Sequence, residues 1–259
     1  MAIIEQHKNG EFCWFELGTS DQAAAKTFYT GLFGWSFNDF PMGPEGVYTI
    51  FKLQDRDAAA CYTPHPEHHK GVPPHWAVYV QVESADAAAA KTTESGGKAV
   101  VPPFDVFDLG RMAVLQDPTG AVFQVWQPKK NKGTGITGVN GTVCWGELRT
   151  NNTAMATAFY TGLFGWKTKD STPPGEYTEW LNSGQPIGGM MTIQAEWGPV
   201  PPHWAIYFQV DDIDATIAKA KASGAKVEIP ATPIPNTGTF AGLSDPQGAH
   251  FLVIQLGKM

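Results

Sequence analysis

The sequence predicts an α+β fold built as a tandem duplication, with four units that each hold a strand, a helix and about three strands. The first observation behind this prediction is that residues 13–35 return at 144–166 with 15 of 23 positions identical. The second is that residues 72–82 recur at 200–210 with 9 of 11 identical. A repeat of this length indicates that the chain contains the same structural unit twice, independently of any local pattern.

The elements of the first unit follow from changes in pattern along the chain. Residues 12–17 alternate and include aromatics, which predicts a strand. Capping residues at 20–21 precede a helical run with apolar residues on one face, and Gly34 ends that helix. Two further strands are predicted at 48–53 and 58–62.

The second unit repeats this order. A strand is predicted at 75–82, and Ser84 caps a helix that ends at Gly96-Gly97. Short strands follow at 100–102, 110–116 and 121–127, the last after the turn Asp117-Pro118-Thr119-Gly120. In the second copy, strands are expected to begin at Val143 and His203, with helices at about 152–164 and 212–223.

The two copies define the expected domains. We expect domain 1 over residues 1–127, a polar, glycine-rich linker over 128–141 and domain 2 over 142–259. Each domain is long enough to bury a core without disulfides or metals. The three cysteines have no metal-type spacing, and we interpret Cys13, Cys61 and Cys144 as reduced core residues in a reducing compartment.

Composition excludes some partners. The net charge is −7, and the tight basic cluster is confined to Lys129, Lys130 and Lys132, which argues against nucleic acid because phosphate binding needs a basic face. No stretch has the roughly 18 apolar residues that span a bilayer, and the N-terminus does not resemble a signal peptide. A cytoplasmic location is therefore expected, with a monomer or a homodimer as the state of assembly.

Three features together resemble a known superfamily. They are the four strand–helix–strands units, the motif FYTGLFGW at the end of the first helix of each copy, and a DPxG turn before each final strand. This set resembles the vicinal oxygen chelate superfamily, which includes glyoxalase I, bleomycin-resistance proteins and extradiol dioxygenases, and it looks closest to two-domain bacterial glyoxalase-like proteins. The resemblance implies curved mixed sheets that form two cups, with the helices outside. It says little about the reaction, because one fold hosts many functions.

The resemblance also implies a divalent metal in each cup, held by His and Glu from the first and last strands of both units. The matching positions here are Trp14, Ala59 or Ala60, Ala77 and Gln124, and in the second copy Trp145, Gly188 or its neighbour, Ala205 and Leu252. Of these, Gln124 alone offers an oxygen, whereas such metals need several His or carboxylate ligands. We therefore expect no metal and no cofactor. The run PHPEHH at 64–69 looks like a metal cluster but is more typical of a proline-rich surface loop.

Strand alternation indicates which other side chains face the cups. Glu16 and Glu147 share a face with Trp14 and Trp145. The candidate catalytic residues are Glu16, His75, Glu147 and His203. The candidate ligand contacts are Trp14, Tyr79, Gln124, Trp126, Trp145, Tyr207 and His250.

Two interpretations of the Glu and His residues stay open. In one, Glu16/His75 and Glu147/His203 are general acid–base pairs, with a glutamate pKa raised by burial beside tryptophan. In the other, each Glu accepts a hydrogen bond from a backbone or ring donor, and each His fixes the loop after Pro-Pro.

The sequence thus supports three functions. The first is a metal-independent glyoxalase-like lyase or isomerase that acts on a carbonyl compound. The second is a protein that binds an aromatic drug or metabolite without turnover. The third is a protein-interaction module with vestigial cups. A small-molecule ligand is the expected partner in the first two.

Overall fold

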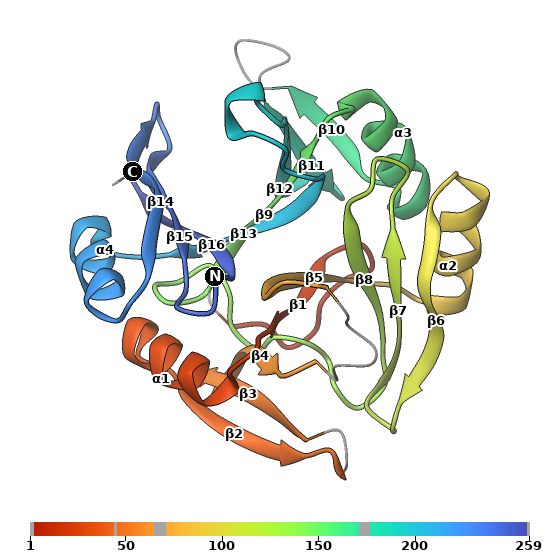
Figure 1. Cartoon of the computed structure of the whole chain (residues 1–259). Coiled ribbons are helices and arrows are strands. Elements are labelled where there is room, and N and C mark those ends of the chain that lie inside the picture. Colours follow the sequence, from red (N-terminus) through yellow and green to blue (C-terminus); the bar gives the residue numbers. More distant parts are fainter. Residues whose placement is uncertain (1–2, 44–45, 65–70, 171–176, 258–259) are drawn as a thin grey trace.

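The computed structural model describes residues 3–43, 46–64, 71–170 and 177–257, and in it each repeat forms one eight-stranded sheet (Figure 1). The elements of the first repeat are β1 (Phe12–Gly18), α1 (Gln22–Phe33), β2 (Ser36–Pro41), β3 (Val47–Leu53), β4 (Arg56–Tyr62), β5 (His75–Gln81), α2 (Ala85–Glu94), β6 (Lys98–Val106), β7 (Gly110–Gln116) and β8 (Val122–Pro128).

The second repeat has the same order. Its elements are β9 (Val143–Thr150), α3 (Thr153–Phe164), β10 (Lys167–Asp170), β11 (Thr178–Asn182), β12 (Gln185–Thr192), the short 3₁₀ helix η2 (Ala195–Trp197), β13 (His203–Gln209), α4 (Ile213–Ala222), β14 (Lys226–Ile234), β15 (Gly238–Ser244) and β16 (His250–Leu256). The predicted α+β duplication of four units is confirmed.

The two sheets are mixed and share one topology. The first runs β2-β3-β4-β1-β5-β8-β7-β6, and the second runs β10-β11-β12-β9-β13-β16-β15-β14. In the centre of the first sheet, β1 is parallel to β4 and antiparallel to β5, and β5 is parallel to β8. One face of each sheet packs in the large core with the helices, and the other is the curved face that forms a cup (Figure 1).

The helix ends agree with the sequence signals. Asp21 caps α1 by accepting a hydrogen bond from Ala24 N, and Gly34 ends the helix at a φ of 73°. That left-handed conformation is easily reached by glycine, which explains the residue there. Ser84 caps α2 in the same way as Asp21 caps α1.

The sequence prediction missed strand β2 and made strand β6 too short. Strand β2 has all its residues exposed, so it shows no alternation of buried and exposed positions. Strand β6 runs over Lys98–Val106, beyond the predicted 100–102, although it contains Pro102 and Pro103. Both strands are sheet edges, where proline is tolerated because one row of backbone groups has no strand partner.

The two repeats share one core, in which the first helix of each repeat contacts the final turn of the other. Tyr29 of α1 donates a hydrogen bond to Asp245 at 2.9 Å and accepts one from Trp76 Nε1 at 3.0 Å. In the other direction, Tyr160 of α3 donates to Asp117 at 2.9 Å and accepts from Trp204 at 2.9 Å. The motif FYTGLFGW and the DPxG turn, which the sequence presents as local features, are partners across the repeats.

The last residue of that motif adds a second cross-repeat bond. Trp35 Nε1 donates to the carbonyl oxygen of Gly141 at 2.7 Å, and Trp166 Nε1 donates to that of Gly10 at 2.8 Å. In Figure 1, α1 accordingly lies beside α4, and α2 beside α3. The repeated motif therefore supplies hydrogen bonds that join the two repeats.

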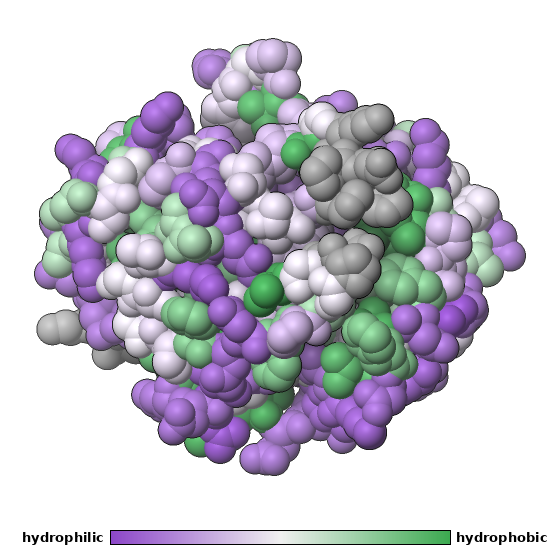
Figure 2. All heavy atoms as spheres, turned by 60° about the horizontal axis from the view of Figure 1, so that its bottom comes forward, coloured by the Kyte–Doolittle hydropathy of each residue, from purple (hydrophilic) through white to green (hydrophobic). Residues whose placement is uncertain are grey.

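The surface is mixed in character. Figure 2 shows hydrophobic patches between hydrophilic residues on one face of the molecule, and the exposed large apolar side chains include Phe37 and Phe40 of β2 and Phe104 of β6. No helix within the described residues is long and apolar enough to cross a membrane. The three cysteines are free thiols, and burial raises the pKa of Cys61 and Cys144 to about 12.

Candidate functional site: two unequal cups

Cup 1 is the curved face of the first sheet around Glu16 in the middle of β1. The strand partners of Glu16 are Ala60 on β4 and Ala77 on β5, whose small side chains leave space for the carboxyl group. Tyr48 Oη donates to Oε2 at 2.6 Å, and Tyr79 Oη donates to Oε1 at 2.8 Å. Both carboxyl oxygens of Glu16 are thus held by tyrosine hydroxyls.

The electrostatics of Glu16 reflect two opposing effects. The residue is 8% exposed, and burial raises the pKa of its carboxyl group, whereas the hydrogen bonds from Tyr48 and Tyr79 act in the opposite direction. Burial is the larger effect, so the pKa of Glu16 lies above its ordinary value. Trp14 Nε1 donates to Tyr48 Oη at 2.9 Å, which extends the chain of donors that points toward the carboxyl group.

Gln124 and Trp126 on β8 complete cup 1. Gln124 lies opposite Tyr79 and is 7% exposed, and its Oε1 is buried without a hydrogen-bond partner among the described residues. An unpaired buried acceptor costs free energy, so this atom is a place where a ligand donor would be stabilising. The indole of Trp126 packs against Gly110, where a Cβ atom would come within 2.2 Å of Cζ2.

His75 lies at the mouth of cup 1, at the start of β5 opposite Gly18. Its Nδ1 is 2.9 Å from the carbonyl oxygen of Pro73, so the ring fixes the loop after Pro-Pro. In the hydrogen bonds of the described residues, Glu16 is joined to two tyrosines and not to His75. The acid–base pairing of Glu16 with His75 stays a prediction.

Cup 2 repeats this frame around Glu147 on β9, but with a positive charge beside the carboxylate. Tyr207 Oη donates to Glu147 Oε2 at 3.0 Å, and Arg149 Nε donates to Oε1 at 2.9 Å. Trp145 Nε1 donates to Tyr177 Oη at 2.7 Å, the counterpart of the Trp14–Tyr48 bond. The Glu147 side chain is 3% exposed and that of Arg149 is 11% exposed, so the two form a buried ion pair.

The histidines of cup 2 lie at its mouth. His203 Nδ1 is 2.9 Å from the carbonyl oxygen of Pro201, as His75 is from Pro73, and burial lowers the pKa of His203. His250 is exposed, and its ring is 3.4 Å from Ser244 Oγ. Where cup 1 has Gln124, cup 2 has Leu252, which is 4% exposed.

The residues missed from the sequence are Tyr48, Tyr177 and Arg149. The two tyrosines could have been matched from the sequence, since each precedes threonine in a Gly-x-Tyr-Thr run. They are harder to align than the longer repeated segments, because the deletion between the copies leaves them 129 positions apart. Arg149 replaces Gly18, so a search for residues kept in both copies passes over it.

The metal site implied by the resemblance does not fit these residues. The implied positions in cup 1 are the indole of Trp14, the methyl groups of Ala60 and Ala77, and the amide of Gln124, and the one carboxylate there already accepts two tyrosine hydroxyls. Over the ranges that the structure describes, no three His, Cys, Asp or Glu side chains are grouped to hold a metal ion. The run at 64–69 lies, apart from Pro64, outside the described residues.

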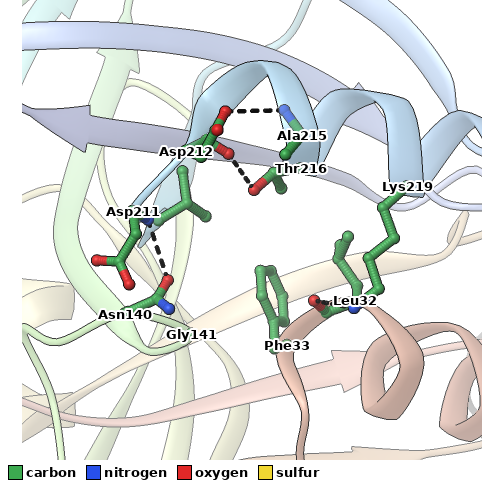
Figure 3. A pocket seen from close by; sticks show the side chains of 10 residues that line it. Leu32, Phe33, Asn140, Gly141, Asp211, Asp212, Ala215, Thr216 and Lys219 are labelled. Atoms are coloured by element: carbon green, nitrogen blue, oxygen red, sulfur yellow. Dashed lines mark hydrogen bonds between the residues drawn. The ribbon is translucent and has the colours of Figure 1, made fainter.

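Two cavities lie away from the cups, and the first of them is at the junction between the repeats. The cavity in Figure 3, of about 250 Å³, lies between the end of α1 and the start of α4. Asn140 Oδ1 there accepts from Asp211 N, and Asp212 caps Ala215 N. A second cavity, of about 650 Å³, is bordered by Asn9 and Glu83, and Glu83 N donates a hydrogen bond to Asn9 Oδ1 at 3.2 Å.

Comparisons with known proteins agree with this architecture. Residues 12–125 and 141–253 each match the sequence model of the Glyoxalase/Bleomycin resistance protein/Dioxygenase superfamily. The chain is 40% identical over 258 residues to the Mycobacterium tuberculosis protein named "Putative glyoxylase CFP32", covering 98% of each chain. It is 37% identical over 260 residues to "Anthracycline biosynthesis protein DnrV" of Streptomyces peucetius, covering 95% of this chain and 94% of that one.

Solved structures share the fold at low sequence identity. The Mn(II)-bound glyoxalase from Novosphingobium aromaticivorans is 16% identical with a TM-score of 0.65, over 98% of this chain and 83% of that one. The 2,3-dioxygenase LapB from Pseudomonas sp. KL28 is 13% identical with a TM-score of 0.65, over 97% of this chain and 94% of that one. At such identities the likeness concerns the fold alone.

Proposed function

Because the chain belongs to the Glyoxalase/Bleomycin resistance protein/Dioxygenase superfamily and has its domain twice, we propose that cup 1 binds a small planar molecule bearing a hydroxyl and a carbonyl group. The observation that carries the proposal is a pair of buried groups in cup 1: among the described residues, Glu16 has no counter-charge and Gln124 Oε1 has no donor. A ligand hydroxyl would donate to Gln124, and the rings of Trp14 and Trp126 would flank an aromatic body.

Glu16 is the group through which such a ligand would react. Because burial raises its pKa, its protonated form can donate a hydrogen bond, and then a proton, to a carbonyl oxygen. The carboxylate left behind is the species that Tyr48 and Tyr79 stabilise by their hydrogen bonds. Isomerisation and lyase reactions of carbonyl compounds require such a proton transfer, and none of these steps passes through a metal.

The names of the relatives support this class of ligand. One relative is named as a glyoxylase, which suggests a carbonyl substrate. Another is named for the biosynthesis of anthracyclines, which are polycyclic aromatic compounds. Both similarities extend over almost the whole chain.

The test is a titration of the protein with 1,8-dihydroxyanthraquinone, followed by tryptophan fluorescence. Gln124→Leu, which gives cup 1 the residue of cup 2, should weaken binding at least about tenfold, because the ligand hydroxyl loses its acceptor. The same variant should be at least as thermostable as the wild type, since an unpaired buried acceptor is removed. The matched variants Tyr79→Phe and Tyr207→Phe show which cup holds the ligand. Binding should weaken in Tyr79→Phe, which alters cup 1, and stay unchanged in Tyr207→Phe, which alters cup 2. Equal affinity in the wild type and Gln124→Leu would contradict the proposal.

Binding without turnover is the second candidate function. It is favoured by one observation: both oxygens of Glu16 already accept hydrogen bonds, so a ligand must compete for them. Incubation in D₂O with a small carbonyl compound that has hydrogen on the carbon beside its carbonyl, such as methylglyoxal, distinguishes the two. Deuterium uptake at the carbon beside the carbonyl that disappears in Glu16→Gln supports catalysis, and saturable binding without uptake supports a pure binding protein.

A further inference from the structure

The two cups differ in charge at one pair of equivalent positions. Gly18 ends β1 in cup 1, and Arg149 takes that place on β9 in cup 2. Each lies directly opposite the histidine that begins the neighbouring central strand: Gly18 is opposite His75 of β5, and Arg149 is opposite His203 of β13. Cup 2 therefore has a guanidinium group at a position where cup 1 has no side chain.

The Arg149 guanidinium has more donors than its described partners use. It carries five N–H groups, and the hydrogen bond to Glu147 uses the one on Nε. Tyr207 is a further hydrogen-bond partner of the guanidinium group, so part of the donor capacity stays unused among the described residues. The remaining N–H groups lie on the Nη side of a planar group whose side chain is only 11% exposed. A buried cation with unused donors is costly, and a planar anion can satisfy two of them at once.

An aromatic ring extends this edge of the cup. The guanidinium carbon of Arg149 is 5.1 Å from the centre of the Trp197 ring, which η2 places over it. Trp145 and Trp197 are both half-buried, so they can be reached from solvent. The floor of cup 2 is apolar, with Leu252 and Ile254 buried in it.

We propose that cup 2 is a separate binding site for a small organic carboxylate with a flat apolar body, whose carboxylate binds the Nη edge of Arg149 and whose body lies against Trp145 and Trp197. Glu147 occupies the Nε edge of the same guanidinium, so it holds the group in place while lowering the net positive charge that a ligand meets. Nothing in this proposal depends on a ligand in cup 1, because no cup 1 residue takes part.

The probe is benzoate, with benzamide as its neutral isostere, and binding is measured by isothermal titration calorimetry. Wild-type protein should bind benzoate at least about tenfold more tightly than benzamide, because a charge-assisted bidentate contact is lost with the amide. The double variant Glu147→Gln/Arg149→Gln, which leaves no unpaired buried charge, should lose that preference. Glu147→Gln alone should tighten benzoate binding, an effect that a merely structural role of Arg149 would not produce.

Two controls separate this site from other arginines and from cup 1. Arg111→Gln removes a guanidinium that pairs with Asp86 and Asp105 on the surface, and it should leave benzoate binding unchanged. Glu16→Gln should also leave it unchanged while altering the anthraquinone titration, so failure of one proposal is distinguishable from failure of the other. Equal binding of benzoate and benzamide, or benzoate binding that persists in the double variant, would overturn the proposal.

Discussion

Replacement of Tyr29 by phenylalanine tests whether the repeats hold each other in place. Its hydroxyl joins Asp245 and Trp76 in a buried network that crosses from α1 to the final turn of the second repeat. Tyr29→Phe keeps the ring in the core and deletes only the hydroxyl, so packing is conserved.

The magnitude follows from the two groups that lose their partner. A carboxyl oxygen of Asp245 and the indole N–H of Trp76 remain buried, and each unpaired group costs about 1–3 kcal/mol. Allowing for some relaxation, the free energy of unfolding should fall by about 2–4 kcal/mol. The loss should also depend on pH. Burial raises the pKa of Asp245, and the Tyr29 hydroxyl counteracts that, so deleting it raises the pKa further. Because ionisation of a carboxyl with a raised folded-state pKa destabilises the fold as pH rises, the loss should be larger at pH 8 than at pH 5.

The assay is urea denaturation followed by tryptophan fluorescence at both pH values, with Tyr160→Phe as the symmetry-related variant. Tyr160 makes the same contacts to Asp117 and Trp204, so it should cost a similar amount near pH 7. Asp245→Asn combined with Tyr29→Phe completes a double-mutant cycle, which should give a coupling energy above about 1 kcal/mol. Wild-type stability in both tyrosine variants would refute the idea that these bonds join the repeats.

Three further perturbations test the cups and the helices. The Tm of Glu16→Gln should rise relative to that of the wild type between pH 4 and pH 8. The reason is that the pKa of Glu16 is raised in the folded state, so ionisation of this carboxyl destabilises the wild type alone. A Tm difference that does not depend on pH would count against this. Gly31→Ala and Gly162→Ala, at exposed helix positions where a Cβ meets nothing within 4 Å, should each stabilise the protein by about 0.5–1 kcal/mol in urea denaturation, and destabilisation would show that the helices need these glycines. Gly110→Ala should cost about 1–3 kcal/mol and red-shift the tryptophan fluorescence, because its Cβ would lie 2.2 Å from the Trp126 ring; an unchanged spectrum would contradict that packing.

Much of the fold could be predicted because the chain contains its own comparison. Segments that recur with the same capping residues and turns mark the same elements twice, which fixes the number and order of units. Strand β2 was invisible to this reasoning since every one of its residues is exposed. The contacts of Tyr29 and Tyr160 were equally hidden, because a local pattern does not reveal that a helix of one repeat meets the turn of the other.

The candidate site could be predicted only where the copies agree. Strand parity placed Glu16 and Trp14 on one face correctly, and the hydrogen bonds through Tyr48 join them. Each histidine ring contacts the carbonyl oxygen of a loop proline, and the pairing of these histidines with the glutamates stays a prediction. Arg149 could not be found by looking for retained residues, because its importance lies in the difference from Gly18.

The most direct test of the unequal cups is the titration of Glu16 itself, followed by ¹³C NMR of protein labelled at the glutamate carboxyl carbon. Glu16→Gln identifies the resonance by removing it. The Glu16 carboxyl should titrate above the range of ordinary glutamates, and Gly18→Arg, which gives cup 1 the counterpart of Arg149, should lower its pKa. Titration of Glu16 at or below the ordinary range would contradict the claim that cup 1 holds a buried acid with no counter-charge among the described residues.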